Sequence, residues 1–248
     1  MTTRRGTAGA DLRFYFDPVC PFCWMTSKWV RMVAARREYR VDWRFIALRL
    51  VNARIDYAAH FPPEYEEGHT AGLRLLRMAA RTRAEHGAAA VERLYETLGA
   101  QIFDVGFVPD TADDHARRGT REFVAPVLTA AGLPAELADA LDDPAWDAVV
   151  QAETDEALGL AGKDVGTPIL QFAPPDGPAF FGPVISRLPG PDEAEEVWDH
   201  VVALARFPGF AELKRSLREL PQLRALGVGE DEVGVVQDWH GGSRRLKR

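Results

Sequence analysis

The two cysteines of this 248-residue chain, Cys20 and Cys23, are three positions apart. A structural disulfide stabilises a protein by closing a long loop, and this pair would close almost none. A disulfide scaffold needs several cysteines spread along a short secreted chain, so that class is excluded. The pair is therefore either chemically active or metal-binding. In the cytoplasm such a pair rests as a dithiol and is more typical of catalysis than of structure.

The motif Cys20–Pro21–Phe22–Cys23 stands where a strand pattern ends and a helix pattern begins. Proline is well tolerated at the first helical position, which would place Cys20 at the N-cap. Free amides of the first turn, including that of Cys23, would then point at the Cys20 sulfur and favour its thiolate. Motifs of this type lower the pKa of the leading cysteine below its free value of ~8.5. We therefore expect Cys20 to be the nucleophile and Cys23 to be the resolving cysteine, which attacks the mixed disulfide.

Two other interpretations of the pair are weaker. A zinc site needs four ligands, and a CxxC motif supplies only two. His60 and His69 would have to complete the set, but they are nine positions apart with two prolines between them. A coincidental buried pair is the other alternative, and it does not explain why the only two cysteines meet at a strand-to-helix turn. We expect redox chemistry and no metal.

Two neighbours of the motif allow both a chemical and a structural role. Asp17 is either a proton acceptor for Cys23 or a turn and cap residue, and the structural role is favoured because Asp before Pro often anchors a turn. Trp24 either flanks the site or packs in the core, and the sequence does not separate these two roles.

The elements around the motif form a βαβ unit. Hydrophobic residues alternate over 12–16, follow near-helical spacing over 22–37 and alternate again over 41–47. Two parallel strands joined by a helix have a right-handed crossover. Strand patterns return only at 169–172 and 179–181, separated by the turn residues Pro174–Pro175–Asp176–Gly177, which indicates a hairpin.

Helical patterns occupy the rest of the chain. From about Pro62 to about Gly162 the strand signal disappears, and 91–102 carries one apolar helix face. A further helix should begin at Asp192, with Glu195 completing a capping box, and a short helix is expected over 211–220.

These elements predict an α/β protein with a thioredoxin-like fold (βαβ…ββα) interrupted by an all-helical insertion. We expect residues 10–55 and 163–222 to form the discontinuous thioredoxin-like domain, residues 56–162 the helical insertion domain, and residues 223–248 a flexible C-terminal tail. Thr167–Pro168 stands directly before a strand of this fold. Considered alone it is a loop proline, but together with the CxxC motif it predicts a cis proline facing the cysteines. The Thr167 backbone would then pair with the backbone of a bound thiol.

Composition limits the partners. The chain is 46% hydrophobic and 27% charged, as in ordinary globular proteins, and its formal net charge is −7. This sign argues against nucleic acid and anionic membranes as partners. There is no apolar run of signal-peptide length and none of the ~18–20 residues that a membrane span requires, so the expected location is the cytoplasm.

Several segments resemble known proteins. The run Phe16–Asp17–Pro18–Val19–Cys20–Pro21–Phe22–Cys23–Trp24 is similar to the DsbA/FrnE-like branch of the thioredoxin superfamily. The resemblance becomes more specific, to the actinobacterial mycothiol-dependent nitroreductases, through four further segments: DVGTP (164–168), AFFGPVIS (179–186), AGLPAEL (131–137) and ELKR (212–215). The resemblance runs from about Leu12 to about Gln222 and covers most of the chain. One residue departs from that family, whose members usually carry Trp at the position of Phe22.

This resemblance implies a cytoplasmic oxidoreductase in which a helical domain caps a thioredoxin core. Cys20 would exchange with the low-molecular-weight thiol mycothiol as reductant, with no tightly bound cofactor. The substrates would be disulfides, in small molecules or proteins, or nitro compounds, and the protein could be a homodimer. Because the middle dipeptide tunes thiolate stability, Phe22 bears on redox potential and substrate fit.

Two rival functions are consistent with the same elements. Kappa-class glutathione transferases and related isomerases share the insertion but typically carry serine where Cys20 stands, which argues against that class. A non-catalytic redox sensor would form the Cys20–Cys23 disulfide reversibly without turnover.

Overall fold

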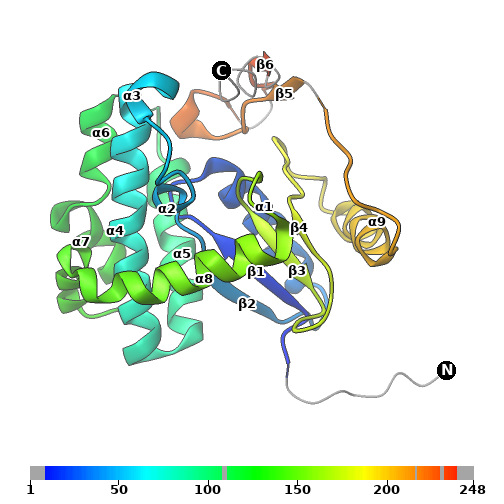
Figure 1. Cartoon of the computed structure of the whole chain (residues 1–248), viewed down its shortest axis with the longest axis horizontal. Helices are drawn as coiled ribbons and strands as arrows, with labels where there is room; N and C mark the ends of the chain where they lie inside the picture. The colour runs from blue at the N-terminus through cyan, green and yellow to red at the C-terminus, as the bar shows by residue number, and fades with distance from the viewer. Residues whose placement is uncertain (1–8, 108–110, 216, 230–231, 239–248) are drawn as a thin grey trace.

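A four-stranded sheet lies at the centre of the molecule (Figure 1). The computed structural model describes residues 9–107, 111–215, 217–229 and 232–238. The strand order is β2–β1–β3–β4, with β1 parallel to β2 and antiparallel to β3, and β3 antiparallel to β4. The bounds are β1 Leu12–Phe16, β2 Val41–Phe45, β3 Ile169–Phe172 and β4 Ala179–Phe181. β1 lies between two strands and is buried on both faces. This explains why hydrophobic side chains occur on both faces of β1 and do not only alternate with polar ones.

Helices cover both faces of this sheet. Helix α1 (Pro21–Ala34) connects β1 to β2, and α9 (Ala194–Arg206) follows β4. These two helices meet through Trp29 and Trp198, whose ring centroids are 5.2 Å apart, and the Trp29 indole N–H donates to the Ala194 carbonyl at 2.8 Å. Helix α8 (Asp147–Ala161) packs on the opposite face, where Ala157 joins a buried cluster with Tyr15 and Ile169. The predicted βαβ unit and ββα unit are therefore both present, and the thioredoxin-like fold is confirmed.

The helical insertion shares its hydrophobic core with the sheet. The short helix α2 (Leu48–Val51) follows β2. The elements of the insertion are then, in chain order, α3 (Tyr57–His60), α4 (Pro63–His86), α5 (Ala88–Phe103), α6 (Ala112–Arg117), α7 (Arg121–Ala130), the 3-10 helices η1 (Ala135–Asp142) and η2 (Pro144–Trp146), and α8. Gly87 alone separates α4 from α5, with a φ of +81° that favours glycine. The fold brings α5 against the sheet, and Tyr95 stacks on Phe16 with ring centroids 3.8 Å apart.

Two predicted helical features near the C-terminus are wrong. Helix α9 begins at Ala194 with Glu193 at its N-cap, because the amides of both residues bond to the Gly190 carbonyl in a preceding turn, and Asp192 lies outside the helix. Residues 211–220 form no helix among the residues described. Leu213 is 85% exposed, so its side chain gains no burial that would stabilise a helix here. Part of it, Leu217–Glu219, forms β5 instead.

The segment after residue 222 packs on the molecule where the structure describes it. Leu223 is buried, Arg224–Leu226 form the 3-10 helix η3, and β6 (Val236–Asp238) pairs antiparallel with β5. Residues 223–229 therefore differ from the flexible tail expected for them. Residues 239–248, the rest of that expected tail, lie outside the described residues. Among the helices described, none combines the length and the apolar character needed to cross a membrane.

The close packing of α5 on α1 depends on a glycine. A Cβ at Gly99 would lie 2.1 Å from a ring atom of Trp24, whereas a Cβ at Gly159 on α8 would meet nothing within 4 Å. We expect Gly99→Ala to lower the free energy of unfolding by about 1–3 kcal/mol, because the core cannot take the added methyl group. The matched change Gly159→Ala should raise it by up to about 1 kcal/mol, since alanine is the better helix former. Urea unfolding of both variants checks this, and equal stabilities would contradict the packing described.

Candidate active site

The CxxC motif occupies the turn from β1 into α1. Cys20 is the N-cap residue of α1 and Pro21 is the first helical residue, as the sequence predicts. The Cys23 backbone N–H donates to the Cys20 sulfur at 3.4 Å, and the Cys20 N–H donates to the Asp17 carbonyl at 3.1 Å. Both sulfurs are free thiols, and Cys20 is 6% exposed whereas Cys23 is 0% exposed. The cysteine at the helix end is thus the more accessible of the two.

The Thr167–Pro168 segment is distant from the CxxC motif in the sequence but lies beside it in the structure. Its peptide bond is cis, and the Thr167 carbonyl lies 3.7 Å from the Cys20 sulfur, which donates to it. Thr167 is itself buried. The fold therefore brings Cys23 and Thr167, both singled out in the sequence, to the sulfur of Cys20.

The environments of the two thiols differ in a direction that suits a nucleophile and a resolving cysteine. Burial alone raises the pKa of Cys20, but hydrogen bonds from the side chains of Cys23 and Thr167 and from the Cys23 amide lower that pKa below its ordinary value. Burial raises the pKa of Cys23 well above its ordinary value, and the adjoining Cys20 raises it further. Cys20 is therefore the thiol that ionises first, and the thiolate is the attacking species.

Asp17 is fully buried beside the motif and links two turns. One carboxylate oxygen accepts from the Val19 N–H at 3.0 Å, and the other accepts from the Leu48 N–H at 2.8 Å. Desolvation raises the pKa of Asp17 to about 7, although both amide hydrogen bonds lower it. These contacts account for the turn-anchoring role. Proton transfer to or from Cys23 stays a prediction.

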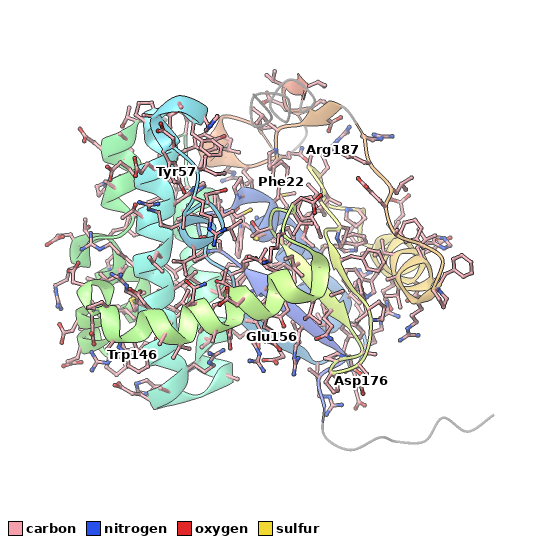
Figure 2. The ribbon with its side chains drawn as sticks, viewed as in Figure 1. Phe22, Tyr57, Trp146, Glu156, Asp176 and Arg187 are labelled. Carbon is pink, nitrogen blue, oxygen red and sulfur yellow. The ribbon has the colours of Figure 1, made fainter. Side chains whose placement is uncertain are left out.

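Trp24 packs in the core, one of the two roles left open by the sequence. Its side chain is 3% exposed, its indole N–H donates to Asp104 at 3.1 Å, and its ring meets Tyr95 edge-on with centroids 5.9 Å apart. Phe22 precedes it on α1 and is also buried at 9% exposure (Figure 2). The side chain of Trp24 therefore serves the contact between α1 and α5.

The histidines considered for zinc have other surroundings. The Tyr57 hydroxyl and the His69 Nδ1 atom are 2.9 Å apart, and desolvation, with nearby Arg49 and His115, lowers the pKa of His69 to about 4. Within the part of the chain that the structure describes, no group of three or more His, Cys, Asp or Glu residues is arranged to hold a metal ion.

The sequence did not point to the residues through which the helical insertion packs against the CxxC motif. A Cβ at Gly72 on α4 would lie 2.6 Å from the Asp17 carboxylate, so α4 approaches the buried acid closely. Tyr95 lies against Phe16 and Trp24, and Asp104 holds the Trp24 indole. Only the apolar helix pattern that includes Tyr95 was visible in the sequence. The two glycines that face the motif, Gly72 and Gly99, carry no local signal of their own.

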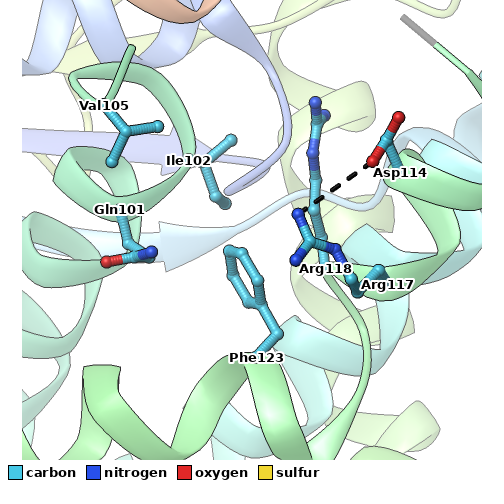
Figure 3. Close-up of a pocket in the computed structure, with 7 residues that line it drawn as sticks. All are labelled: Gln101, Ile102, Val105, Asp114, Arg117, Arg118 and Phe123. Carbon is cyan, nitrogen blue, oxygen red and sulfur yellow. Dashed lines mark ion pairs between the residues drawn. The ribbon is translucent and has the colours of Figure 1, made fainter. Parts of the chain in front are cut away.

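Two cavities flank the end of α5. One, of about 90 Å³, lies between α5, α6 and α7, where Ile102 and Phe123 face Arg118 and the Asp114–Arg117 ion pair (Figure 3). The other, of about 280 Å³, is lined by Lys28, Asp104, Gln222, Arg224 and Val228.

The topology and the CxxC turn define the class of protein as a thioredoxin-fold protein with a helical insertion and a pair of thiols at the start of α1. The family model described as Rv2466c-like, mycothiol-dependent nitroreductase Rv2466c, matches residues 19–215. The chain belongs to this family, and it is a thiol-dependent oxidoreductase.

The proteins that are similar to the chain include one from Mycobacterium and one from Streptomyces. The uncharacterised protein Rv2286c of Mycobacterium tuberculosis is 32% identical over 204 residues, which cover 82% of this chain and 80% of that protein. The crystal structure of a probable DsbA oxidoreductase, SCO1869 from Streptomyces coelicolor, aligns with a TM-score of 0.48 at 17% identity. That alignment covers 90% of this chain and 98% of the Streptomyces chain.

The difference between the two thiols predicts selective alkylation. Iodoacetamide at pH 7 should modify Cys20 at least roughly tenfold faster than Cys23, because alkylation requires the thiolate and only Cys20 has a lowered pKa. Peptide mass spectrometry of the reduced protein over time measures both rates. In Cys20→Ser, Cys23 should stay slow. Faster modification of Cys23 in the intact protein would contradict the assignment.

The buried Asp17 predicts a stability that falls as the pH rises. The folded protein keeps the Asp17 proton up to about pH 7, whereas the unfolded chain loses it near 3.8. The unfolded state therefore binds fewer protons in this window, and the free energy of unfolding should drop by about 4 kcal/mol between pH 4 and pH 7. Urea unfolding of the reduced protein measures the drop.

A substitution tests whether Asp17, and not another acid, causes this pH dependence of stability. Asp17→Asn should remove most of this slope, although it loses one of the two amide hydrogen bonds. Asp56→Asn is the control, because the Asp56 carboxylate also accepts from a backbone amide, that of Ala59, but is exposed. A slope that persists in Asp17→Asn would show that another group causes it.

Proposed function

We propose that the protein is a thiol–disulfide oxidoreductase in which Cys20 and Cys23 alternate between dithiol and disulfide, with mycothiol as the reductant. The single observation that carries the proposal is the Cys20 sulfur at the N-cap of α1, 3.4 Å from the Cys23 amide. The description of the family supports mycothiol as the thiol. The proposal implies a compartment reducing enough to keep the resting pair as a dithiol, such as the cytoplasm.

The first step is attack on a substrate disulfide. The Cys20 thiolate forms a bond to one sulfur, the substrate S–S bond breaks, and the second substrate sulfur leaves as a thiolate that takes a proton from solvent. The product is a mixed disulfide on Cys20. The Cys23 amide and the other first-turn amides of α1 favour the attacking thiolate. The Thr167 carbonyl at 3.7 Å from the sulfur is near enough that the adjoining backbone is available to align the incoming chain.

The second step is resolution by Cys23. Its thiolate attacks the Cys20 sulfur, the mixed disulfide breaks, and the second substrate thiol leaves. The two substrate sulfurs have then gained two electrons, which the Cys20–Cys23 pair has lost. Two molecules of mycothiol return these electrons and become mycothiol disulfide. Because the pKa of Cys23 is raised, a proton acceptor would assist this step, and the buried Asp17 is the nearest candidate identified in the sequence.

Nitro compounds are a second class of acceptor for the same pair. Oxidation of the dithiol to the disulfide releases two electrons and two protons, which is the requirement for converting a nitro group to a nitroso group and one water. The family description supports this acceptor class for the chain. A homodimer is also part of the proposal, and gel filtration with light scattering tests it.

A transferase or isomerase of the kappa-class kind is the rival from another enzyme class. It would use one thiol only, so Cys23→Ser would leave its activity unchanged. A redox sensor without turnover is the rival outside catalysis, and it would form the disulfide without consuming mycothiol.

Incubation with mycothiol disulfide tests the proposal. Cys23→Ser should accumulate a mycothiol adduct on Cys20, because no second thiol resolves the mixed disulfide. The wild-type protein should instead show the Cys20–Cys23 disulfide and free mycothiol. Cys20→Ala should show neither product, and its turnover should fall to the uncatalysed rate. Intact-mass and peptide mass spectrometry identify each species.

The same samples give the contradicting outcomes. Turnover that survives in Cys20→Ala would end the proposed mechanism. If Cys23→Ser forms an adduct with cystine but none with mycothiol disulfide, the thiol–disulfide chemistry stands and the mycothiol assignment fails.

A further inference from the structure

The larger cavity, of about 280 Å³, lies beside the first turns of α1. Lys28 of α1 forms one wall, and Asp104 forms another just beyond the end of α5. The Lys28 ammonium and an Asp104 carboxylate oxygen are 2.6 Å apart. Gln222, Arg224 and Val228 of the C-terminal segment complete the lining. This volume is just below the range of volumes of ligand-binding pockets, roughly 300–1,000 Å³.

A hydrogen bond of Trp24 joins one wall of this cavity to the helix turn that carries the redox pair. Trp24 follows Cys23 directly, and its indole N–H donates to the same Asp104 oxygen that pairs with Lys28. A helix rises ~1.5 Å per residue, so Trp24 and Lys28 lie roughly 6 and 12 Å along α1 from Cys20. A thiol that carries one or two sugar-sized groups is long enough to cover this span while its sulfur meets Cys20.

The C-terminal side of the cavity is held in place by its own contacts. The Gln222 N–H donates to the Ser186 carbonyl at 2.7 Å, and Glu219 pairs with Arg187 through two bonds of 2.9 and 2.8 Å. The preceding loop is tied to α1, because the Thr26 hydroxyl donates to the Pro183 carbonyl at 2.8 Å. Residues 222–228 lie beyond the stretch 19–215 that the family model matches, so the family match gives no role to this wall.

The lining indicates the chemistry of the ligand. Lys28, Arg224 and Gln222 supply hydrogen-bond donors, whereas Asp104 and the Gln222 amide oxygen supply acceptors, and Val228 is the one apolar residue. Hydroxyl groups both donate and accept, so an uncharged polyol satisfies this mixture. The cavity of about 90 Å³ between α5 and α7 holds only a few water molecules, at ~30 Å³ each, and is too small for such a group.

We infer that the cavity formed by Lys28, Asp104, Gln222, Arg224 and Val228 binds the hydroxyl-rich, uncharged part of the thiol cosubstrate. The inference rests on the proposed function and adds a recognition site to it. The C-terminal segment would thereby decide which low-molecular-weight thiol reaches Cys20. A polyol-bearing thiol is selected over a thiol that lacks such a group.

Variants of the C-terminal wall test the inference. Arg224→Ala and Gln222→Ala should each raise the KM for mycothiol roughly tenfold and leave kcat unchanged, because one hydrogen bond to bound thiol is lost. Neither variant should change the second-order rate constant with N-acetylcysteine, a thiol that has no hydroxyl-rich group. Arg206→Ala on α9 and Gln151→Ala on α8 are the matched controls, since both side chains are exposed elsewhere on the surface.

A second measurement separates binding from redox chemistry. Mycothiol methylated on its sulfur cannot exchange, and isothermal titration calorimetry should show that it binds the wild-type protein and binds both wall variants about tenfold more weakly. If this binding behaves as expected but mycothiol gives no turnover, the proposed function fails and the cavity assignment stands. If turnover occurs but the wall variants bind and react like the wild-type protein, the cavity assignment fails and the function stands. Absence of any binding to the wild-type protein would also overturn the cavity assignment.

Discussion

The first amides of α1 have no partners within the helix, and the Cys23 amide donates to the sulfur of Cys20. This interaction offsets part of the cost of burying an ionisable thiol that is only 6% exposed. It requires Cys20 at the N-cap and a proline that can begin the helix behind it. It also requires β1 to end at this point, so that α1 starts at the end of a central strand, beside the Thr167 backbone. The rest of the fold serves to hold these backbone segments at one sulfur.

Close packing around that sulfur requires glycine at two helix contacts and buries the acid Asp17. Helices α4 and α5 approach the motif so closely that methyl groups at Gly72 and Gly99 would collide with Asp17 and Trp24. The same approach removes water from Asp17 and raises its pKa to about 7. An exposed acid at this position would stay ionised and would be unable to exchange a proton near neutral pH. The helical insertion therefore sets the polarity around Asp17 as well as covering the motif.

The C-terminal segment extends this arrangement beyond residues 19–215, the stretch that the family model matches. It is joined to the loop after β4 through Ser186 and Arg187, and it faces Lys28 and Asp104 across a polar cavity. The redox chemistry belongs to α1, whereas recognition of the thiol in our proposal belongs to a segment outside the stretch that the family model matches. Such a division would let recognition change during evolution without disturbing the cysteines.

The sequence by itself determined the order of β1, α1, β2, β3, β4 and α9 and the positions of the two thiols, because hydrophobic period, proline at the helix start and cysteine spacing are local properties. It also predicted the cis peptide bond before Pro168, which the structure contains. Only the tertiary structure decided that Trp24 packs against α5, that the described residues of 211–220 form no helix, and that residues 223–229 pack on the molecule. Those outcomes depend on contacts such as Trp24 with Asp104 and Glu219 with Arg187, whose partners are 80 and 32 positions apart. Local propensity carries no information about partners that only the folded chain brings together.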